Sequence, residues 1–579
     1  MSRSPGLKGA NANGNANGGE RELTPDLVID AARKGFVYLP LGGVGEIGMN
    51  FYLYGCDGKW IAVEMGVTFA DATLPGIDLI VPDPDFAESL GDDLIAIVIT
   101  HGHEDHLGAV PYLGMRFPRA PVYATPFAAG LIAAKLEEAE LEDAVDLHTV
   151  PLGAKLKLGP FDVEYVAVTH SIPEPNALLI RTRYGTVLHT GDFKIDPTPL
   201  LGQPTDQAKI RAAGDHGILA LVCDSTNATL EGKTGSEAEV RESLREIIAT
   251  CRQRVAVACF ASNVARLTSL VHAAHANGRR VALVGRSLWR YTEIARRCGY
   301  LDGMAPFLTD HDVERLPSEN VLMICTGSQG EPNSALARIA SRDHAVRLDP
   351  GDTVIFSSKE IPGNEKPIAT VQNLLIAQGI HILTDRTHFV HVSGHPARDD
   401  LRIMYDLARP RLAIPMHGEI RHLSAHMELA LTKGAAPHLV TDGTAFRLAP
   451  EPARVIGHVN YGRFVVDGLR LLPIDSPVLS QRRRLTYNGL AVVTVVLDRK
   501  GRVAAPPQVS IEGVLDKEHD RSTQDTLADD VAMALRAMPR RASEDDAQVH
   551  DAVRRAIRQR TTAESGKKPM VQVHLVRLD

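Results

Sequence analysis

The chain has 579 residues, enough for two to four domains with cores of their own. Hydrophobic residues make up 44% and charged residues 23%, as in an ordinary globular protein, and the net charge of −8 gives no global sign of a nucleic-acid partner. The apolar runs are too short to span a bilayer, and the first residues lack the apolar segment of a secretory signal. We therefore expect a cytoplasmic protein without a membrane partner.

Two further features of composition support this expectation. Residues 1–29 are rich in Asn, Gly and Ala and predict a flexible tail, because they offer little to bury. The six cysteines show no C-x-x-C spacing, and several lie in apolar runs. This usage is typical of reduced, mostly buried thiols in a cytosolic protein.

Short apolar runs typical of β-strands recur along the chain, and each ends beside polar residues. In chain order they occupy residues 94–99, 161–168, 185–190, 218–223, 254–261, 280–285, 321–325, 388–392 and 411–416. Ligand sites of open α/β sheets lie at the carboxyl ends of strands, so we expect a common cleft there. The last part of the chain predicts a hairpin at 490–503, an amphipathic helix at 526–538 and a terminal strand at 569–578.

The stretch "THGHEDHLGA" (100–109) places three histidines and two acids directly after a predicted strand. On a solvated loop these residues would be harmless, and a lone histidine is more often structural than a ligand. The H-x-H-x-D-H spacing instead suits metal binding, because imidazole and carboxylate groups on rigid elements are preferred ligands. His101 and His103 could serve one metal, with Asp105 and His106 serving a neighbouring one.

Later strand ends can complete both sets. His170 would close the first set, His417 would close the second, and Asp192 could bridge them. Two metals held in this way clamp the attacking and leaving oxygens of a phosphoryl displacement and lower the pKa of a bound water. The sequence therefore predicts a hydrolytic two-metal site.

The H-x-H-x-D-H motif resembles the signature of the metallo-β-lactamase superfamily. The wider pattern is similar to its β-CASP nucleases, and within them most similar to the ribonuclease J family. The similar stretches begin with "LGGVGEIGMN" (41–50) and "GIDLIVPD" (76–83), and continue with "THSIPEPN" (169–176), "HTGDFKID" (189–196), "CDSTNA" (223–228), "FASNVAR" (260–266), "VGRSL" (284–288), "CTGSQGEP" (325–332), "FSSKEIPGNE" (356–365), "HVSGH" (391–395) and "PMHGEIRHL" (415–423).

The resemblance implies an α/β fold, a four-layer αββα metallo-β-lactamase sandwich with an inserted β-CASP α/β domain and a small α+β C-terminal domain. The implied boundaries are a tail at 1–29, the sandwich at 30–225 and 366–469, the β-CASP domain at 226–365 and the C-terminal domain at 470–579. It also implies two Zn²⁺ ions per subunit, for which Mn²⁺ or Mg²⁺ could substitute. The implied zinc ligands are His101, His103, Asp105, His106, His170, Asp192 and His417.

The resemblance assigns further roles. Asp224 matches the acidic residue of the first β-CASP motif, and His395 matches a histidine that assists at the scissile phosphate; with Asp105 these are the expected catalytic residues. Arg286 and Ser328 are weaker candidates for holding a terminal 5′-phosphate, which Arg and Ser suit chemically. The loops implied to contact nucleotides contain Phe260, Ala261, Ser262, His391, Val392, Ser393, Gly394 and His395.

Two positions depart from the family pattern. Glu64 stands where the family usually carries an aspartate that orients metal ligands, and such partners can be worth 10–100-fold in metal affinity or activity. Ala265 stands where a histidine often follows the "FASN" loop. The first departure puts full activity in question, and the second weakens inference about how the substrate is gripped there.

The expected function is a zinc-dependent ribonuclease with 5′-to-3′ exonuclease and endonuclease action in RNA maturation and mRNA decay. Its expected partners are single-stranded RNA with a 5′-monophosphate, further copies of itself in a homodimer or homotetramer, and an RNA-decay complex. The alternatives are a DNA-directed β-CASP nuclease and a catalytically weakened RNA-binding scaffold. A small-substrate hydrolase, such as a lactonase or thioesterase, should lack both residues 226–365 and the "HVSGH" histidine.

Overall fold

The computed structural model describes residues 24–71, 73–516 and 521–578, with the side chains of 521–525 left aside. Residues 1–23 of the expected tail lie outside this part. The end of that expectation is wrong, because helix α1 (Pro25–Arg33) begins four residues before its predicted limit. Val28 and Ala32 of α1 are fully buried, so the apolar face of this short helix holds it on the sheet next to it.

Two mixed sheets form the body that carries the candidate site. The larger has the strand order β22-β21-β1-β2-β3-β6-β7-β8. Its strands, in that order, are Arg454–His458, Thr444–Ala449, Phe36–Gly42, Phe51–Cys56, Lys59–Val63, Leu94–Val98, Val122–Ala124 and Leu147–Thr149. The smaller has the order β20-β19-β13-β12-β11-β10-β9. Its strands are Ala436–Pro437, Leu412–Met416, Ala220–Asp224, Gly185–His189, Asn176–Thr182, Phe161–Ala167 and Lys155–Leu158.

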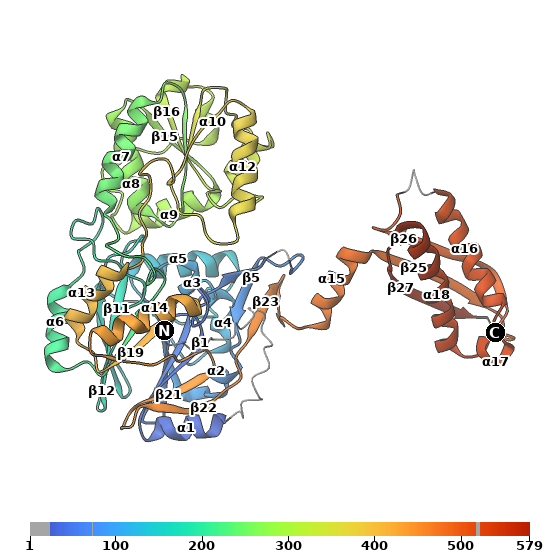
Figure 1. Ribbon diagram of the computed structural model, residues 1–579, viewed down its shortest axis with the longest axis horizontal. Helices are drawn as coiled ribbons and strands as arrows, with labels where there is room; N and C mark the ends of the chain where they lie inside the picture. Colours follow the sequence, from blue (N-terminus) through green and yellow to red (C-terminus); the bar gives the residue numbers. More distant parts are fainter. Residues whose placement is uncertain (1–23, 72, 517–520, 579) are drawn as a thin grey trace, which may run out of the picture. The chain divides into compact units, whose positions relative to one another are not determined.

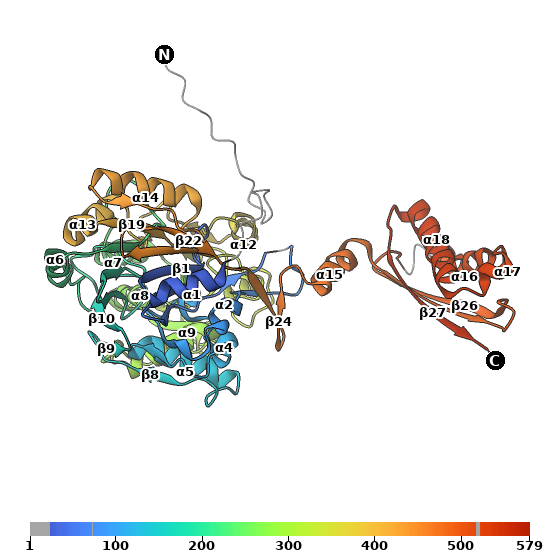
Figure 2. The same ribbon diagram turned by 90° about the horizontal axis from the view of Figure 1, so that it is seen from below.

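The two sheets share one apolar core. Aromatic side chains from both meet in it, for example Phe36 against Phe161 with ring centroids 6.3 Å apart. Helices α6 (Gln207–His216), α13 (Arg398–Ala408) and α14 (Ile420–Thr432) cover the outer face of the smaller sheet. Figure 2 shows α13 and α14 on one side of the stacked sheets and α4 (Val110–Leu113) with α5 (Pro126–Glu138) on the other. The expected αββα sandwich is confirmed.

A third, five-stranded sheet forms a separate α/β layer system, drawn in green and yellow in Figure 1. All its pairs are parallel, in the order β15-β16-β14-β17-β18. The strands are Arg280–Val284, Val321–Cys325, Val255–Ala258, Thr353–Phe356 and His381–Leu383, and the main helices are α7 (Glu237–Thr250), α8 (Val264–Ala276), α9 (Arg286–Arg297), α11 (Ala335–Ala340) and α12 (Glu365–Ala377). The sheet therefore extends past residue 365, because α12 leads to its last strand.

The strand expected at residues 388–392 does not form. The carbonyl oxygen of Val390 accepts hydrogen bonds from Arg266 Nη1 (3.0 Å) and from the Ser357 hydroxyl (2.7 Å). Side chains thus take the place of a neighbouring strand as hydrogen-bond donors to this backbone carbonyl. Val390 and Val392 of this segment are buried without joining a sheet, whereas Phe389 is 48% exposed.

The C-terminal part forms its own compact unit, residues 464–579 with 69–80. Helix α15 (Pro477–Asn488) precedes β25 (Leu490–Leu497), which pairs antiparallel with β26 (Val503–Glu512) and parallel with β27 (Met570–Arg577). Helices α16 (Arg521–Arg536) and α18 (Asp546–Ser565) supply apolar side chains to the core of this sheet. The predicted hairpin, helix and terminal strand are all confirmed.

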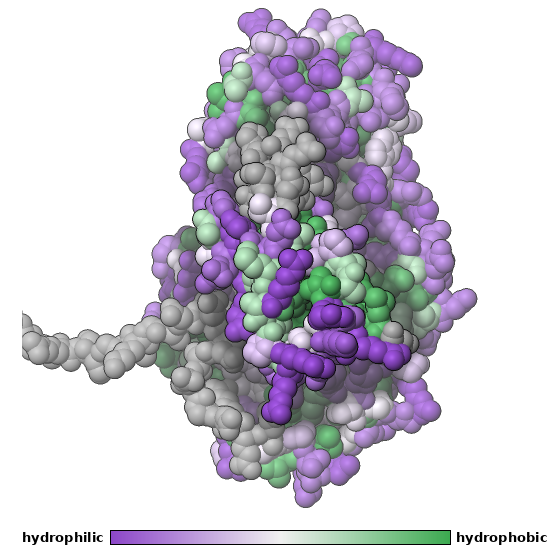
Figure 3. All heavy atoms as spheres, turned by 90° about the vertical axis from the view of Figure 1, so that its right-hand side faces the viewer, coloured by the Kyte–Doolittle hydropathy of each residue, from purple (hydrophilic) through white to green (hydrophobic). Residues whose placement is uncertain are grey.

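The surface of the protein is mixed in character. Figure 3 shows one face on which hydrophilic side chains surround a smaller group of hydrophobic ones. Among the helices that the structure describes, none has the length and apolarity needed to cross a membrane.

Candidate metal centre

The first set of candidate ligands gathers where strands of both sheets end. His101 and His103 follow β6, His170 follows β10 and Asp192 follows β12. One ligand atom of each lies within 4.8 Å of the others. His103 Nδ1 is 3.2 Å from His101 Nε2 and 3.0 Å from His170 Nε2, and Asp192 Oδ2 is 3.6 Å from His170 Nε2. This is the first of the two groups that the sequence predicted.

The second set shares Asp192. His106 lies in the short helix α3 (Glu104–Leu107), and its Nε2 is 3.1 Å from Asp192 Oδ2. His417 follows β19, and its Nε2 is 3.1 Å from Asp105 Oδ2. These four residues also offer ligand atoms within 4.8 Å of one another. The structure thus brings all seven candidate ligands together in two groups joined at Asp192.

The donor set fits divalent cations. Asp192 is 1% exposed, and its Oδ1 has no hydrogen-bond partner among the described residues, so a buried carboxylate oxygen is left available for a metal. Burial lowers the pKa values of His101 and His170 far below the ordinary value, which keeps both imidazoles neutral as metal ligation requires.

The other side of the cluster carries excess negative charge. Burial alone would lower the pKa of His417, but the carboxylates of Asp192 and Asp105 outweigh burial and raise it to about 10. The pKa of His106 is likewise raised well above its ordinary value by Asp192, Asp105 and Glu64, against the effect of burial. His417 and His106 therefore hold protons at positions that suit a cation. A bound metal would replace these protons.

Glu64 lies behind both groups. It contacts the outer nitrogen of His106 directly and that of His101 through Thr100. Its Oε1 is 3.1 Å from His106 Nδ1. The Thr100 hydroxyl donates to the same carboxylate and also lies 2.9 Å from His101 Nδ1. Glu64 is fully buried, and its backbone adopts φ = 67°. Despite its extra methylene, Glu64 thus reaches the ligands that the family's aspartate is expected to orient.

Two further outer contacts were not foreseen from the sequence. Nδ1 of His170 donates to the carbonyl oxygen of Gly394 at 2.6 Å, which leaves Nε2 free for a metal. Nδ1 of His417 lies 2.8 Å from the Thr226 hydroxyl, which in turn donates to Asp224 Oδ1 at 2.8 Å. Backbone carbonyls and threonine hydroxyls carry no distinctive sequence signal, so only the fold reveals these partners.

His395 stands beside the cluster and is held by Asp224. Its Nδ1 is 2.8 Å from Asp224 Oδ2 and 3.7 Å from Asp192 Oδ2. Burial alone would lower the pKa of His395, but the two carboxylates outweigh it and raise that pKa above its ordinary value. The side chain is 22% exposed, so its ring can meet a substrate. This geometry places a partly exposed imidazole, held by Asp224, at the edge of the candidate metal centre.

The loop around His395 is fixed at several points. The Asn227 amide donates to Ser393 Oγ (2.8 Å) and to the His395 carbonyl (3.1 Å), and the Thr234 hydroxyl donates to that carbonyl at 2.7 Å. His391 Nδ1, in contrast, is buried without a hydrogen-bond partner among the described residues. Gly394 is confined as well, because a Cβ there would lie 2.7 Å from the His170 ring.

The predicted phosphate-binding residues lie elsewhere on the five-stranded sheet. Phe260, Ala261 and Ser262 follow β14 and are half-buried. Arg286 is exposed at the start of α9 and lines a cavity of about 370 Å³ together with Trp289, Asn333, Arg338 and His344. Ser328 follows β16, is 3% exposed and does not line this cavity. The structure thus places Arg338 and the carboxylate of Asp310 in the same cavity as Arg286 but does not join Ser328 to them.

Models of known families match four segments of the chain. A β-lactamase superfamily domain matches residues 75–211, the β-CASP domain of ribonuclease J matches 252–375, a Zn-dependent metallo-hydrolase RNA specificity domain matches 379–440, and the ribonuclease J C-terminal domain matches 477–578. A ribonuclease J of Sinorhizobium meliloti is 46% identical, with 94% of this chain and 97% of the relative covered. The chain belongs to the ribonuclease J family.

Other relatives agree with this family assignment. The ribonuclease J of Corynebacterium glutamicum is 40% identical over 83% of this chain and 68% of the relative. That of Thermus thermophilus is 38% identical over 79% of this chain and 82% of the relative. A solved structure of a protein of unknown function from Enterococcus faecalis aligns with a TM-score of 0.49 at 15% identity, covering 75% of this chain and all of that one, a likeness too weak to add to the assignment.

Proposed function

We propose that this chain, a metal-dependent ribonuclease by family, uses two zinc ions and combines 5′-to-3′ exonuclease with endonuclease action in RNA maturation and decay. The observation that supports it most is the pair of ligand groups joined at Asp192, with His395 beside them. Divalent metals bound there lower the pKa of a water and neutralise charge on a phosphodiester. His101, His103, His170 and Asp192 would hold one metal; Asp105, His106, His417 and Asp192 would hold the other.

His395 supplies the proton that the leaving ribose oxygen needs. Asp224 raises the pKa of the imidazole against the effect of burial, which favours its protonated form, and fixes its Nδ1, which leaves Nε2 to face the substrate. Asp224 also holds Thr226 and through it His417, so one carboxylate aligns the proton donor with a metal ligand. Each of these roles belongs to a side chain that the fold has already oriented before RNA arrives.

The 5′ end of the substrate is proposed to bind at the carboxyl ends of β14–β16. Arg286 offers a guanidinium that pairs well with phosphate oxygens. Its cavity also contains Arg338, which adds positive charge, beside the carboxylate of Asp310. A monophosphate would receive charge-assisted hydrogen bonds, whereas a 5′-hydroxyl would leave these donors unpaired. Homodimers or homotetramers and an RNA-decay complex remain predictions from the family, which the mass of the purified protein and its co-purified partners would test.

The decisive experiment digests end-labelled RNA with purified protein, with and without a chelator. Substrates with 5′-monophosphate, 5′-triphosphate and 5′-hydroxyl ends are compared, and single-stranded DNA of the same sequence is the control. We expect chelator-sensitive release of mononucleotides from the 5′ end, fastest on the monophosphate. Equal rates on all three ends would refute the 5′ pocket, and faster cleavage of DNA would favour a DNA-directed nuclease. Binding of RNA without metal-dependent cleavage would favour the scaffold.

A further inference from the structure

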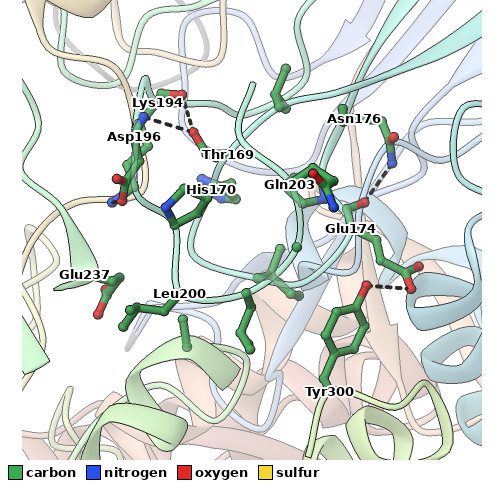
Figure 4. Close-up of a pocket in the computed structure, with 18 of the residues that line it drawn as sticks. Thr169, His170, Glu174, Asn176, Lys194, Asp196, Leu200, Gln203, Glu237 and Tyr300 are labelled. Carbon is green, nitrogen blue, oxygen red and sulfur yellow. Dashed lines mark hydrogen bonds and ion pairs between the residues drawn. The ribbon is translucent and has the colours of Figure 1, made fainter. Parts of the chain in front are cut away.

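A second cavity, of about 320 Å³, lies on the His170 side of the metal cluster. We call it the His170 cavity. In Figure 4 His170, Asp196 and Glu237 lie along one side of it, with Gln203 and Tyr300 on the other. The sandwich supplies most of its wall, and Glu237 at the start of α7, Ala265 at the start of α8 and Tyr300 after α9 supply the rest. Its volume is at the lower end of the range for small-molecule sites, which is room for one compact organic group.

The walls are mainly apolar, with a few polar groups directed at the same space. Ile172, Pro175 and Leu200 supply apolar surface next to His170. Such a lining, with a small number of placed polar groups, is typical of sites for small molecules. A planar base could pack against these side chains, because flat apolar surface is what a base offers to a protein.

The charges of the His170 cavity disfavour a phosphate. Glu174, Asp196 and Glu237 all line it, and Lys194 is the cation among its lining residues. Lys194 is 2% exposed and already occupied, since its ammonium lies 3.3 Å from Asp196 Oδ2 and donates to the Gly235 carbonyl at 3.0 Å. Carboxylate oxygens that keep free lone pairs accept hydrogen bonds from hydroxyl groups. The cavity therefore suits a neutral group rich in hydroxyls.

The carboxylates are held rigidly in place. Glu237 forms a two-pronged ion pair with the fully buried Arg266, at 2.7 and 3.0 Å. Asp196 Oδ1 accepts the backbone N–H of Thr198 at 3.0 Å. Both carboxylates are therefore fixed before any ligand enters, which lowers the entropic cost of binding.

Ala265 leaves this space open. It is the second residue of α8, it is half-buried and it lines the cavity. Any larger side chain at this position would extend into the volume that Ala265 leaves free. The departure from the family pattern noted in the sequence is thus the residue that borders the cavity on the α8 side.

We propose that the His170 cavity binds one ribonucleoside unit of the RNA next to the scissile phosphate. The ribose 2′-hydroxyl, which the RNA chain leaves unesterified, donates to the carboxylate pair of Asp196 and Glu237, and the base packs against Ile172, Pro175 and Leu200. The attached phosphate stays outside the cavity, toward the metals that His170 helps to hold. This assignment rests on the proposed ribonuclease function and adds to it a site that selects ribose.

Filling the cavity tests the proposal. In the full-length metal-loaded protein, Ala265→Leu should weaken the binding of adenosine, measured by equilibrium dialysis, by about tenfold or more, and should raise KM for RNA more than it lowers kcat. The control is Ala276→Leu, an exposed alanine at the end of the same helix that does not line the cavity. It should change neither quantity. Unchanged adenosine binding and KM in a folded Ala265→Leu protein that still cleaves RNA would overturn the cavity assignment and leave the nuclease function standing.

A second comparison tests the ribose contacts without altering the fold. Adenosine should bind the parent protein more tightly than 2′-deoxyadenosine, because the latter lacks the 2′-hydroxyl that donates to Asp196 and Glu237. Leu200→Ala, which removes half-buried apolar surface, should weaken both ligands by the same factor. Equal affinity for the two nucleosides would overturn the ribose assignment, as would an adenosine affinity that Leu200→Ala does not change. Absence of any RNA cleavage by the parent protein would instead count against the proposed function.

Discussion

The metal cluster and the loops of the five-stranded sheet are built in opposite ways. In the cluster, His101, His170 and His417 are almost completely buried, and each has its outer nitrogen next to a second protein group. On the five-stranded sheet, Arg286 is exposed at a helix start, in a loop region open to solvent. The candidate metal ligands, which need fixed distances, thus follow rigid strands, whereas the proposed contact to the 5′ end of RNA lies on exposed surface.

Removing Asp192, the ligand shared by both metal groups, should have the largest effect on activity. We expect Asp192→Asn to lower kcat on the order of 10³-fold or more, because the change weakens both metal groups at once. His103→Ala should act similarly. Metal content by mass spectrometry and cleavage of labelled RNA are the measurements, with Asp162→Asn on the exposed side of β10 as the control. Near-normal turnover in folded Asp192→Asn would contradict the two-metal assignment.

The proton donor gives the next largest effect. His395→Ala should lower kcat by about 10²–10⁴-fold while the metal content stays intact. Exposed His388→Ala is the matched control. Loss of metal from His395→Ala would instead make this residue a metal ligand.

The Asp224–His395 pair also predicts a pH dependence. Asp224 raises the pKa of His395, so the protonated form that donates persists to a higher pH. In Asp224→Asn that support is lost, the pKa of His395 falls, and activity should disappear at a lower pH on the alkaline side. Profiles of kcat against pH for the two proteins measure the shift. An alkaline limb that stays in place would show that another group supplies the proton.

Substitutions at Glu64 should weaken metal binding in the cluster without removing a ligand. Glu64→Ala should lower metal affinity by about 10–100-fold, because His106 loses its outer partner and Thr100 its acceptor. Glu64→Asp restores the family's usual residue and should keep or raise activity. Titration with zinc in the presence of a competing chelator gives the affinities. Unchanged affinity and rate in Glu64→Ala would reduce this residue to core packing.

Substitution of the exposed Arg286 on the five-stranded sheet should give the smallest loss of activity. Arg286→Ala should reduce the preference for 5′-monophosphate RNA by about tenfold, the scale of one charge-assisted hydrogen bond, and should affect internal cutting less. Arg290→Ala is the control, since it lies one turn further along α9 and is paired with Glu138. The measurement is the ratio of rates on monophosphate and hydroxyl ends. A loss of internal cutting as large as the loss of end preference would argue that Arg286 grips the strand in general.

Much of the metal site could be predicted because its ligands follow strands that are strongly apolar. β6 is buried apart from the half-buried Ile95, four consecutive residues of β10 are buried, and a histidine follows shortly after each strand. The five-stranded sheet was harder to delimit, since α12 and β18 lie beyond the expected boundary at residue 365. β18 has only three residues, one exposed and two half-buried, so its sequence gives little periodic signal.

The failures have a common physical origin. Residues 388–392 look like a strand because they are apolar, but Arg266 and Ser357 from distant parts of the chain occupy the Val390 carbonyl. The contacts that orient His170 and His417 also come from loops far away in sequence. Local pattern determines which residues are buried, whereas the identity of the partner depends on the tertiary fold.

The order of the ligands along the chain bears on when the enzyme becomes active. Asp105 and His417 meet at 3.1 Å although 312 positions separate them in the sequence. A polypeptide still emerging from the ribosome therefore lacks His417 of the second metal group until residue 417 has been translated and has left the ribosome. A fragment that stops short of residue 417 lacks this proposed ligand, and we expect it to be inactive as a nuclease.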